Sequence, residues 1–142
     1  MRVPTSILLL SLSIAPALPA GPVDFNRDIR PILSDKCFMC HGPDEATLEA
    51  GLRLDIRESA IDSGAIVPGD PGASELIHRI TTTDRSDVMP PPKVKKPVSE
   101  KEIALLTQWI EEGAAYEGHW AFQPIGNPEP PSVADEAWIT NG

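Results

Sequence analysis

Apolar residues at helical spacing mark the first ordered stretch of the chain, over residues 24–37. The apolar set, which recurs every three or four positions, is Phe25, Ile29, Ile32 and Leu33. Asp24 or Asn26 could accept a bond from a free amide of the first turn and so cap this helix. Pro31 lies inside the pattern. Because an interior proline removes a helical hydrogen bond, we expect a kink or a later start there.

Two further helices are predicted over residues 74–81 and 99–112. Ser74 is a suitable N-cap for the shorter one. The longer one opens with an S-x-x-E capping box of Ser99 and Glu102, and a glycine follows at its end. The apolar faces of the two helices are Leu76, Ile77 and Ile80 in the first, and Ile103, Leu106, Trp109 and Ile110 in the second.

The segments between these helices carry different patterns. Residues 51–55 alternate apolar and charged side chains, and residues 64–69 form a second short extended run. We expect the two runs to pair as short strands around a helical turn at 56–63, with a structured loop as the alternative. Residues 84–98 are polar and proline-rich, which predicts a loop. The expected fold is mainly α with a short two-stranded excursion, in one domain over residues 23–116.

Both ends of the chain differ from this domain. A short basic start precedes an apolar run over residues 7–15 and then small residues up to Ala20, which is the order of parts in a secretory signal peptide. The rival interpretation, an uncleaved membrane anchor, is disfavoured because the run is shorter than the roughly 20 residues that span a bilayer. We therefore predict a signal peptide over residues 1–20, cleaved after Ala17 or Ala20, and export to the periplasm or another extracytoplasmic space. Residues 117–142 are rich in proline and predict an extended tail or linker.

The charge of the chain narrows its partners. The 142 residues carry a formal net charge of −9 at pH 7. A nucleic-acid role is excluded, because phosphate binding needs a basic face. An acidic surface instead favours docking to a basic partner protein.

The two cysteines of the chain lie in one pentapeptide, Cys37-Phe38-Met39-Cys40-His41. This is the C-x-x-C-H attachment signature of a c-type haem. The two thiols add across the vinyl groups of one haem, and the adjacent imidazole of His41 can then serve as the proximal iron ligand. Aromatic residues make up only 5% of the chain, so a buried haem would supply apolar surface that the core otherwise lacks.

Other interpretations of the two cysteines are weaker. A redox dithiol wants a thioredoxin-like βαβ context, which the sequence does not predict. A zinc site needs two more ligands, and the spacing of His41, His78 and His119 fits no compact zinc pattern. A disulfide between residues three apart is geometrically awkward.

Met89 is the candidate for the second axial position on the iron. Methionine sulfur is a soft, neutral ligand, and a His/Met pair raises the reduction potential. Of the other methionines, Met1 lies in the signal peptide and Met39 lies inside the attachment motif, where geometry keeps it from the opposite face of the ring. The alternative is that Met89 is an ordinary apolar contact. His41 is expected to donate its other ring N–H to a carbonyl, as ligating histidines usually do.

Residues 23–115 resemble the Planctomycete-type cytochrome c domain, a class I-like c-type cytochrome module. The matching stretches are residues 25–33, 37–42, 51–55, 65–69, 89–91, 102–103, 109–110 and 113–114. The resemblance implies a small cytochrome c-like helical fold around one covalent haem c. It places the thioethers at Cys37 and Cys40, the proximal ligand at His41 and the distal ligand at Met89.

Export and this resemblance together predict a one-electron carrier without catalytic activity of its own. Its redox partner would be another protein or a fused domain, because residues 119–124 look like the linker that leads to much larger domains in many family members. The chain departs from the family at Ala50, where a glycine often stands. A haem enzyme or small-ligand sensor with an open sixth site is one alternative, and a haem-free metal or disulfide module is another. No stable membrane span is expected after signal cleavage.

Overall fold

The computed structural model describes residues 21–118. The predicted signal peptide and nearly all of the predicted tail lie outside this range. The helices, in chain order, are η1 (Phe25–Ile29), α1 (Arg30–Lys36), α2 (Phe38–His41), α3 (Arg57–Asp62), η2 (Pro71–Ala73), α4 (Glu75–Thr81), η3 (Pro92–Val94) and α5 (Glu100–Glu111). The expectation of a mainly helical fold is therefore confirmed.

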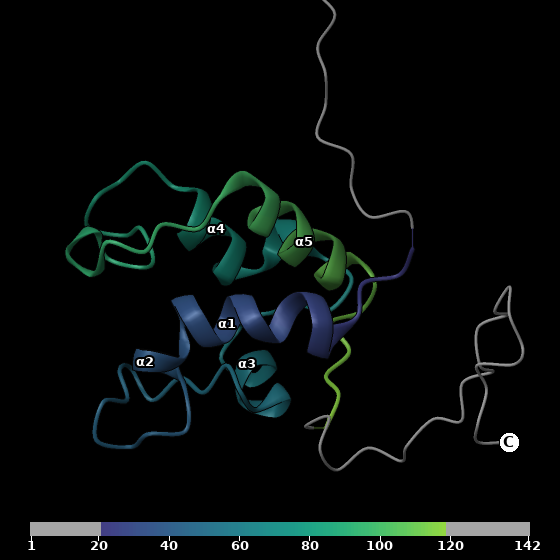
Figure 1. Cartoon of the computed structure of the whole chain (residues 1–142), viewed down its shortest axis with the longest axis horizontal. Coiled ribbons are helices and arrows are strands. Elements are labelled where there is room, and N and C mark those ends of the chain that lie inside the picture. The colour runs from purple at the N-terminus through teal and green to yellow at the C-terminus, as the bar shows by residue number, and fades with distance from the viewer. Residues whose placement is uncertain (1–20, 119–142) are drawn as a thin grey trace, which may run out of the picture.

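Helix α1 crosses the middle of the molecule, with α4 and α5 on one side and α3 on the other (Figure 1). Helix α2 follows α1 at one end of the molecule, and two long loops, residues 42–56 and 82–98, extend at that same end (Figure 1). No helix within residues 21–118 combines the length and apolar character needed to cross a bilayer.

The first predicted helix is present but divided. It begins as a π-helical turn, η1, in which the Arg30 amide bonds back to the Phe25 carbonyl, and continues as α1. Asp24 is the N-cap, and its carboxylate accepts from the Arg27 amide at 2.7 Å. Pro31 falls in the first turn of α1, where a missing N–H costs little. The expected interruption at Pro31 thus takes the form of a wide turn directly before it.

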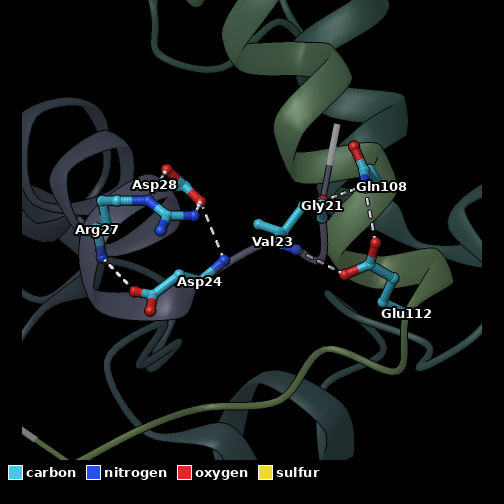
Figure 2. Close-up of polar contacts among 7 residues, drawn as sticks. All are labelled: Gly21, Val23, Asp24, Arg27, Asp28, Gln108 and Glu112. Carbon is cyan, nitrogen blue, oxygen red and sulfur yellow. Dashed lines mark hydrogen bonds and ion pairs between the residues drawn. The ribbon is translucent and has the colours of Figure 1, made fainter. Parts of the chain in front are cut away.

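The first described residues bind to the last turn of α5. The Val23 amide donates to Glu112 Oε2 at 2.9 Å. Gln108 Nε2 donates to Glu112 Oε1 at 2.7 Å and lies 3.5 Å from the Gly21 carbonyl. Figure 2 shows this segment crossing from the Asp24 cap of η1 to α5. These bonds join the segment just before η1 to the end of α5, which is far away in sequence.

The core lies between η1, α1 and α5. Its fully buried aliphatic residues include Ile29, Leu33, Ile66, Leu106 and Ile110. An aromatic cluster closes one end, where the Tyr116 ring lies 4.6 Å from that of Phe25 and 5.2 Å from that of Trp109, centroid to centroid. The Trp109 indole N–H donates to the Ala115 carbonyl at 2.9 Å, so the polar edge of this buried ring is satisfied.

Helix α5 begins and ends as its sequence predicts. The Glu102 amide donates to Ser99 Oγ, and the Ser99 amide donates to Glu102 Oε2 at 2.7 Å, which completes the capping box. Gly113 follows the helix with a φ of 101°, a conformation that favours glycine.

Helix α4 also begins where predicted, but Ser74 does not cap it with its side chain. The Ser74 hydroxyl instead donates to the Asp70 carbonyl at 2.8 Å and accepts from the Val67 amide at 2.9 Å. Because Ser74 is only 1% exposed, its hydroxyl satisfies the buried backbone of the preceding loop.

The predicted two-stranded excursion is wrong, and the structured-loop alternative describes residues 44–70, apart from the helical turn α3 at 57–62. The amides of the two runs bond elsewhere: Leu54 N–H donates to the His41 carbonyl at 2.8 Å, and Ile66 N–H donates to the Ala60 carbonyl at 3.0 Å. The apolar and charged alternation instead reflects Leu54 packing in the core while Arg53 and Asp55 pair with each other.

Candidate haem site

Cys37, Cys40 and His41 lie together on one turn of chain. Cys37 joins α1 to α2, while Cys40 and His41 belong to α2. The Cys37 carbonyl accepts from the His41 amide at 2.8 Å and from the Cys40 amide at 3.1 Å. These bonds hold the motif as a helical turn, which keeps the two thiols and the imidazole within one short segment.

The two thiols are free, since Cys37 and Cys40 form no disulfide. Burial raises the pKa of the Cys37 thiol to about 12, and the carboxylates of Asp35 and Glu102 contribute in the same direction. A reactive redox dithiol needs a lowered pKa, so this environment does not support the dithiol interpretation. Within residues 21–118, no group of three or more His, Cys, Asp or Glu side chains is arranged to hold a metal ion, so the zinc interpretation gains no support either.

His41 is buried at one ring nitrogen. Nδ1 is inaccessible to solvent and has no hydrogen-bond partner in the described part of the chain. The expected bond from the imidazole to a carbonyl is therefore not found among these residues. A buried polar atom without a hydrogen-bond partner requires an explanation. One explanation is that the imidazole belongs to a binding site whose bound group is needed to complete it.

The loop after α2 folds back onto the motif. Gly42 is buried, and a Cβ at this position would collide with the Phe38 carbonyl oxygen, so only glycine fits there. The Glu49 amide donates to the Cys40 carbonyl at 2.8 Å, as the Leu54 amide does to the His41 carbonyl at 2.8 Å. The loop thus satisfies the last carbonyls of α2, which a helix end leaves unpaired.

Tyr116 supports this loop from the far end of the sequence. Its hydroxyl donates to the Leu54 carbonyl at 3.0 Å. Leu54 therefore links Tyr116 on one side to the His41 backbone on the other. The sequence does not indicate that Tyr116 lies near the site. Tyr116 is the one tyrosine of the chain, which could have drawn attention to it. The residues around it in sequence do not indicate that its hydroxyl binds the Leu54 carbonyl.

Met89 lies on the second loop, at the wall of a cavity of about 320 Å³. The Met89 amide donates to the Arg79 carbonyl at 2.8 Å, which fixes the start of this loop to α4. The cavity is lined by Ile80, Val88, Met89, Lys95, Lys96, Val98 and the four prolines of the loop. Met89 is thus far from the C-x-x-C-H turn in sequence. The loop that carries it nevertheless extends at the same end of the molecule as α2 (Figure 1).

The other candidates fall outside this arrangement. Met39 is 59% exposed, in agreement with its exclusion as an iron ligand. His78 is exposed on α4. His119 lies outside the described residues.

The residues present fit a covalent haem. Two free thiols and a histidine with an unpaired buried nitrogen share one turn, and a methionine lines a cavity walled mostly by aliphatic side chains and prolines. Thiol and imidazole are the groups that attach and ligate a c-type haem, and thioether sulfur is the usual complement.

Comparison with known proteins finds a family match over part of the chain. The family model for Planctomycete cytochrome C matches residues 37–93, which include both cysteines, His41 and Met89. No curated protein and no solved structure matches the chain. The resemblance drawn from the sequence is thus confirmed over residues 37–93, which match the Planctomycete cytochrome C family model.

Proposed function

We propose that this chain is an exported c-type cytochrome that transfers single electrons through one covalently bound haem. Cys37 and Cys40 would form the thioethers, with His41 and Met89 as axial ligands. The observation that carries the proposal is the C-x-x-C-H turn with free thiols, inside a cytochrome family match that extends to Met89.

The turn supplies the two thiols that the attachment chemistry uses. Each thiol would add across one vinyl group of a haem, forming a C–S bond and passing its hydrogen to the neighbouring vinyl carbon. When bound, the haem supplies an iron that gains or loses one electron while no substrate bond is made or broken. The protein would anchor the group at Cys37, which packs against the core, and would offer the Met89 sulfur, which favours the reduced iron.

Export and partner choice belong to the same proposal. The signal-like sequence at the start of the chain would deliver it to the compartment where haem is normally attached. The net charge of −9 favours a basic redox partner, and docking to it should weaken as salt is added.

The proposal is tested by expression in a host that matures c-type haem. We expect an intact mass equal to the processed chain plus one haem, and a Cys37→Ser/Cys40→Ser variant without it. The ferric protein should show a sulfur-to-iron charge-transfer band that Met89→Ala loses and Met39→Ala, the matched control, retains. An intact mass equal to the haem-free chain would overturn the proposal. Loss of the band in neither variant would remove Met89 from it.

A further inference from the structure

An ion pair joins the two segments that the proposed haem site uses. Lys96 Nζ donates to Asp35 Oδ1 at 2.6 Å and lies 3.3 Å from the Asp35 carbonyl oxygen. Asp35 stands two residues before Cys37, and Lys96 lies on the loop that carries Met89. We propose that Asp35 and Lys96 are a positioning pair that holds the Met89 loop against the attachment motif and limits how often the Met89 sulfur leaves the iron. This inference rests on the proposed function.

The first half of the Met89 loop has its own anchor. The Met89 amide bonds to the Arg79 carbonyl, and Arg79 Nη1 lies 3.0 Å from Asp87 Oδ1. These contacts fix the chain up to Met89 against α4. They leave the second half of the loop, residues 90–97, to be held by other means.

The second half of the loop can make few backbone bonds. Four of its eight residues are prolines, which have no N–H to donate. Its backbone bonds, from Val94 to Pro91 and from Lys95 to Pro92, stay within the loop. Among the hydrogen bonds of residues 21–118, those of Lys96 to Asp35 alone connect residues 90–97 to another element.

The Asp35 carboxylate is itself held in place. Its second oxygen lies 3.0 Å from Lys36 Nζ, and Lys36 Nζ also lies 3.9 Å from Glu102 Oε1 on α5. The hydrogen bond from Lys96, and to a smaller extent the one from Lys36, lowers the pKa of Asp35. Its carboxylate is therefore charged at neutral pH. The Lys96–Asp35 pair, called the tether from here on, is therefore linked through Lys36 of α1 to Glu102 of α5.

The tether is expected to be weak and sensitive to salt. The side chains of Asp35 and Lys96 are each 50% exposed. Exposed ion pairs change equilibria by a small factor, about two- to fivefold, and salt screens them. Such a pair is suited to adjusting an opening equilibrium while leaving the fold intact.

The test measures carbon monoxide binding to the reduced, haem-loaded protein, because carbon monoxide competes with Met89 for iron. In Lys96→Ala and in Asp35→Asn we expect binding about two- to fivefold faster than in wild type. The double variant should be no faster than either single one, since both remove the same contact. Raising salt should speed binding in wild type but not in the variants.

The matched control is Lys93→Ala. Lys93 is an exposed lysine of the same loop with no ion pair among the described residues, so its loss changes the net charge equally. Lys93→Ala should bind carbon monoxide at the wild-type rate, and Lys96→Arg should restore that rate. A second measurement, hydrogen exchange of the Val94 amide, should accelerate in Lys96→Ala and in Asp35→Asn but not in Lys93→Ala.

The outcomes separate the tether from the proposed ligation. If Met89→Ala binds carbon monoxide rapidly but Lys96→Ala behaves as Lys93→Ala does, the positioning role is overturned and the His/Met haem stands. If Met89→Ala leaves binding unchanged, the ligation fails, and with it the effect of the pair on iron. Faster Val94 exchange in Lys96→Ala would then still support the tether as a contact that holds the loop.

Discussion

Replacing Tyr116 by Phe should cost about 1 kcal/mol of unfolding free energy at pH 7. The substitution keeps the ring that packs 4.6 Å from Phe25 and 5.2 Å from Trp109, centroid to centroid. It removes the bond from the Tyr116 hydroxyl to the Leu54 carbonyl at 3.0 Å. A typical intramolecular hydrogen bond contributes roughly 0.5–1.5 kcal/mol, and an unsatisfied buried carbonyl raises the loss toward about 2 kcal/mol.

The same substitution should change how stability depends on alkaline pH. Burial raises the pKa of Tyr116 above its ordinary value of 10.0. From about pH 10 the unfolded chain therefore loses the phenol proton while the folded chain keeps it. Wild-type stability then falls by about 1.4 kcal/mol per pH unit up to the folded pKa, and Tyr116→Phe lacks this contribution. The deficit of the variant should shrink above pH 10 and then reverse.

Urea unfolding of the haem-loaded proteins at pH 7, 10 and 11 provides the measurement. Lysines titrate over the same range, but equally in both proteins, so the difference between them isolates Tyr116. Phe25→Leu is the control, because it disturbs the aromatic cluster and leaves the hydroxyl in place; it should lose stability at every pH with the wild-type alkaline slope. Equal stability of Tyr116→Phe and wild type at pH 7, with equal slopes above pH 10, would refute the role assigned to the hydroxyl.

Three substitutions and one labelling experiment test other parts of the fold. Ala50 has a φ of 54°, a conformation that costs a non-glycine residue about 1–2 kcal/mol, so Ala50→Gly should gain about 0.5–1 kcal/mol and raise the melting temperature. Ser99→Ala removes one half of the capping box and should lower the free energy of unfolding in urea by about 1 kcal/mol. The Ser74 side chain makes no capping bond, so Ser74→Ala should leave the helix content unchanged while it weakens the loop before α4. The raised pKa of Cys37, about 12 against 9.0, lowers its thiolate fraction, so Cys37 of the haem-free chain should be alkylated more slowly at pH 8 without urea than in the urea-unfolded chain.

Features set by neighbouring residues were predictable from the sequence. The capping box of α5 and the Asp24 cap depend on side chains three residues from the amides they bind; the sequence predicts the box and gives Asp24 as one of two candidates for the cap. The C-x-x-C-H turn belongs to the same class, because its geometry is fixed by bonds between residues three and four apart.

Features that depend on distant partners were not predictable in the same way. The alternation over residues 51–55 is compatible with a strand, yet the Leu54 amide finds its acceptor in the His41 carbonyl at the end of α2. Ala50 and Gly51 both have positive φ, which turns the chain before the run begins. A pattern of side chains does not reveal which carbonyl lies opposite, so loop and strand could not be separated.

The two sides of the proposed haem site are held by different forces, and this difference has a consequence. On the His41 side, Gly42 packs against Phe38 and the carbonyls of Cys40 and His41 accept backbone bonds, none of which depends on charge. On the Met89 side, the tie of the second half of the loop is the Lys96–Asp35 pair, whose partners are 61 residues apart. Because screening weakens only the charged contact, added salt should loosen the Met89 loop while the attachment turn keeps its structure. A redox partner that approached with its own charges near Lys96 would act on the same contact, so docking and axial ligation would be coupled through this one pair.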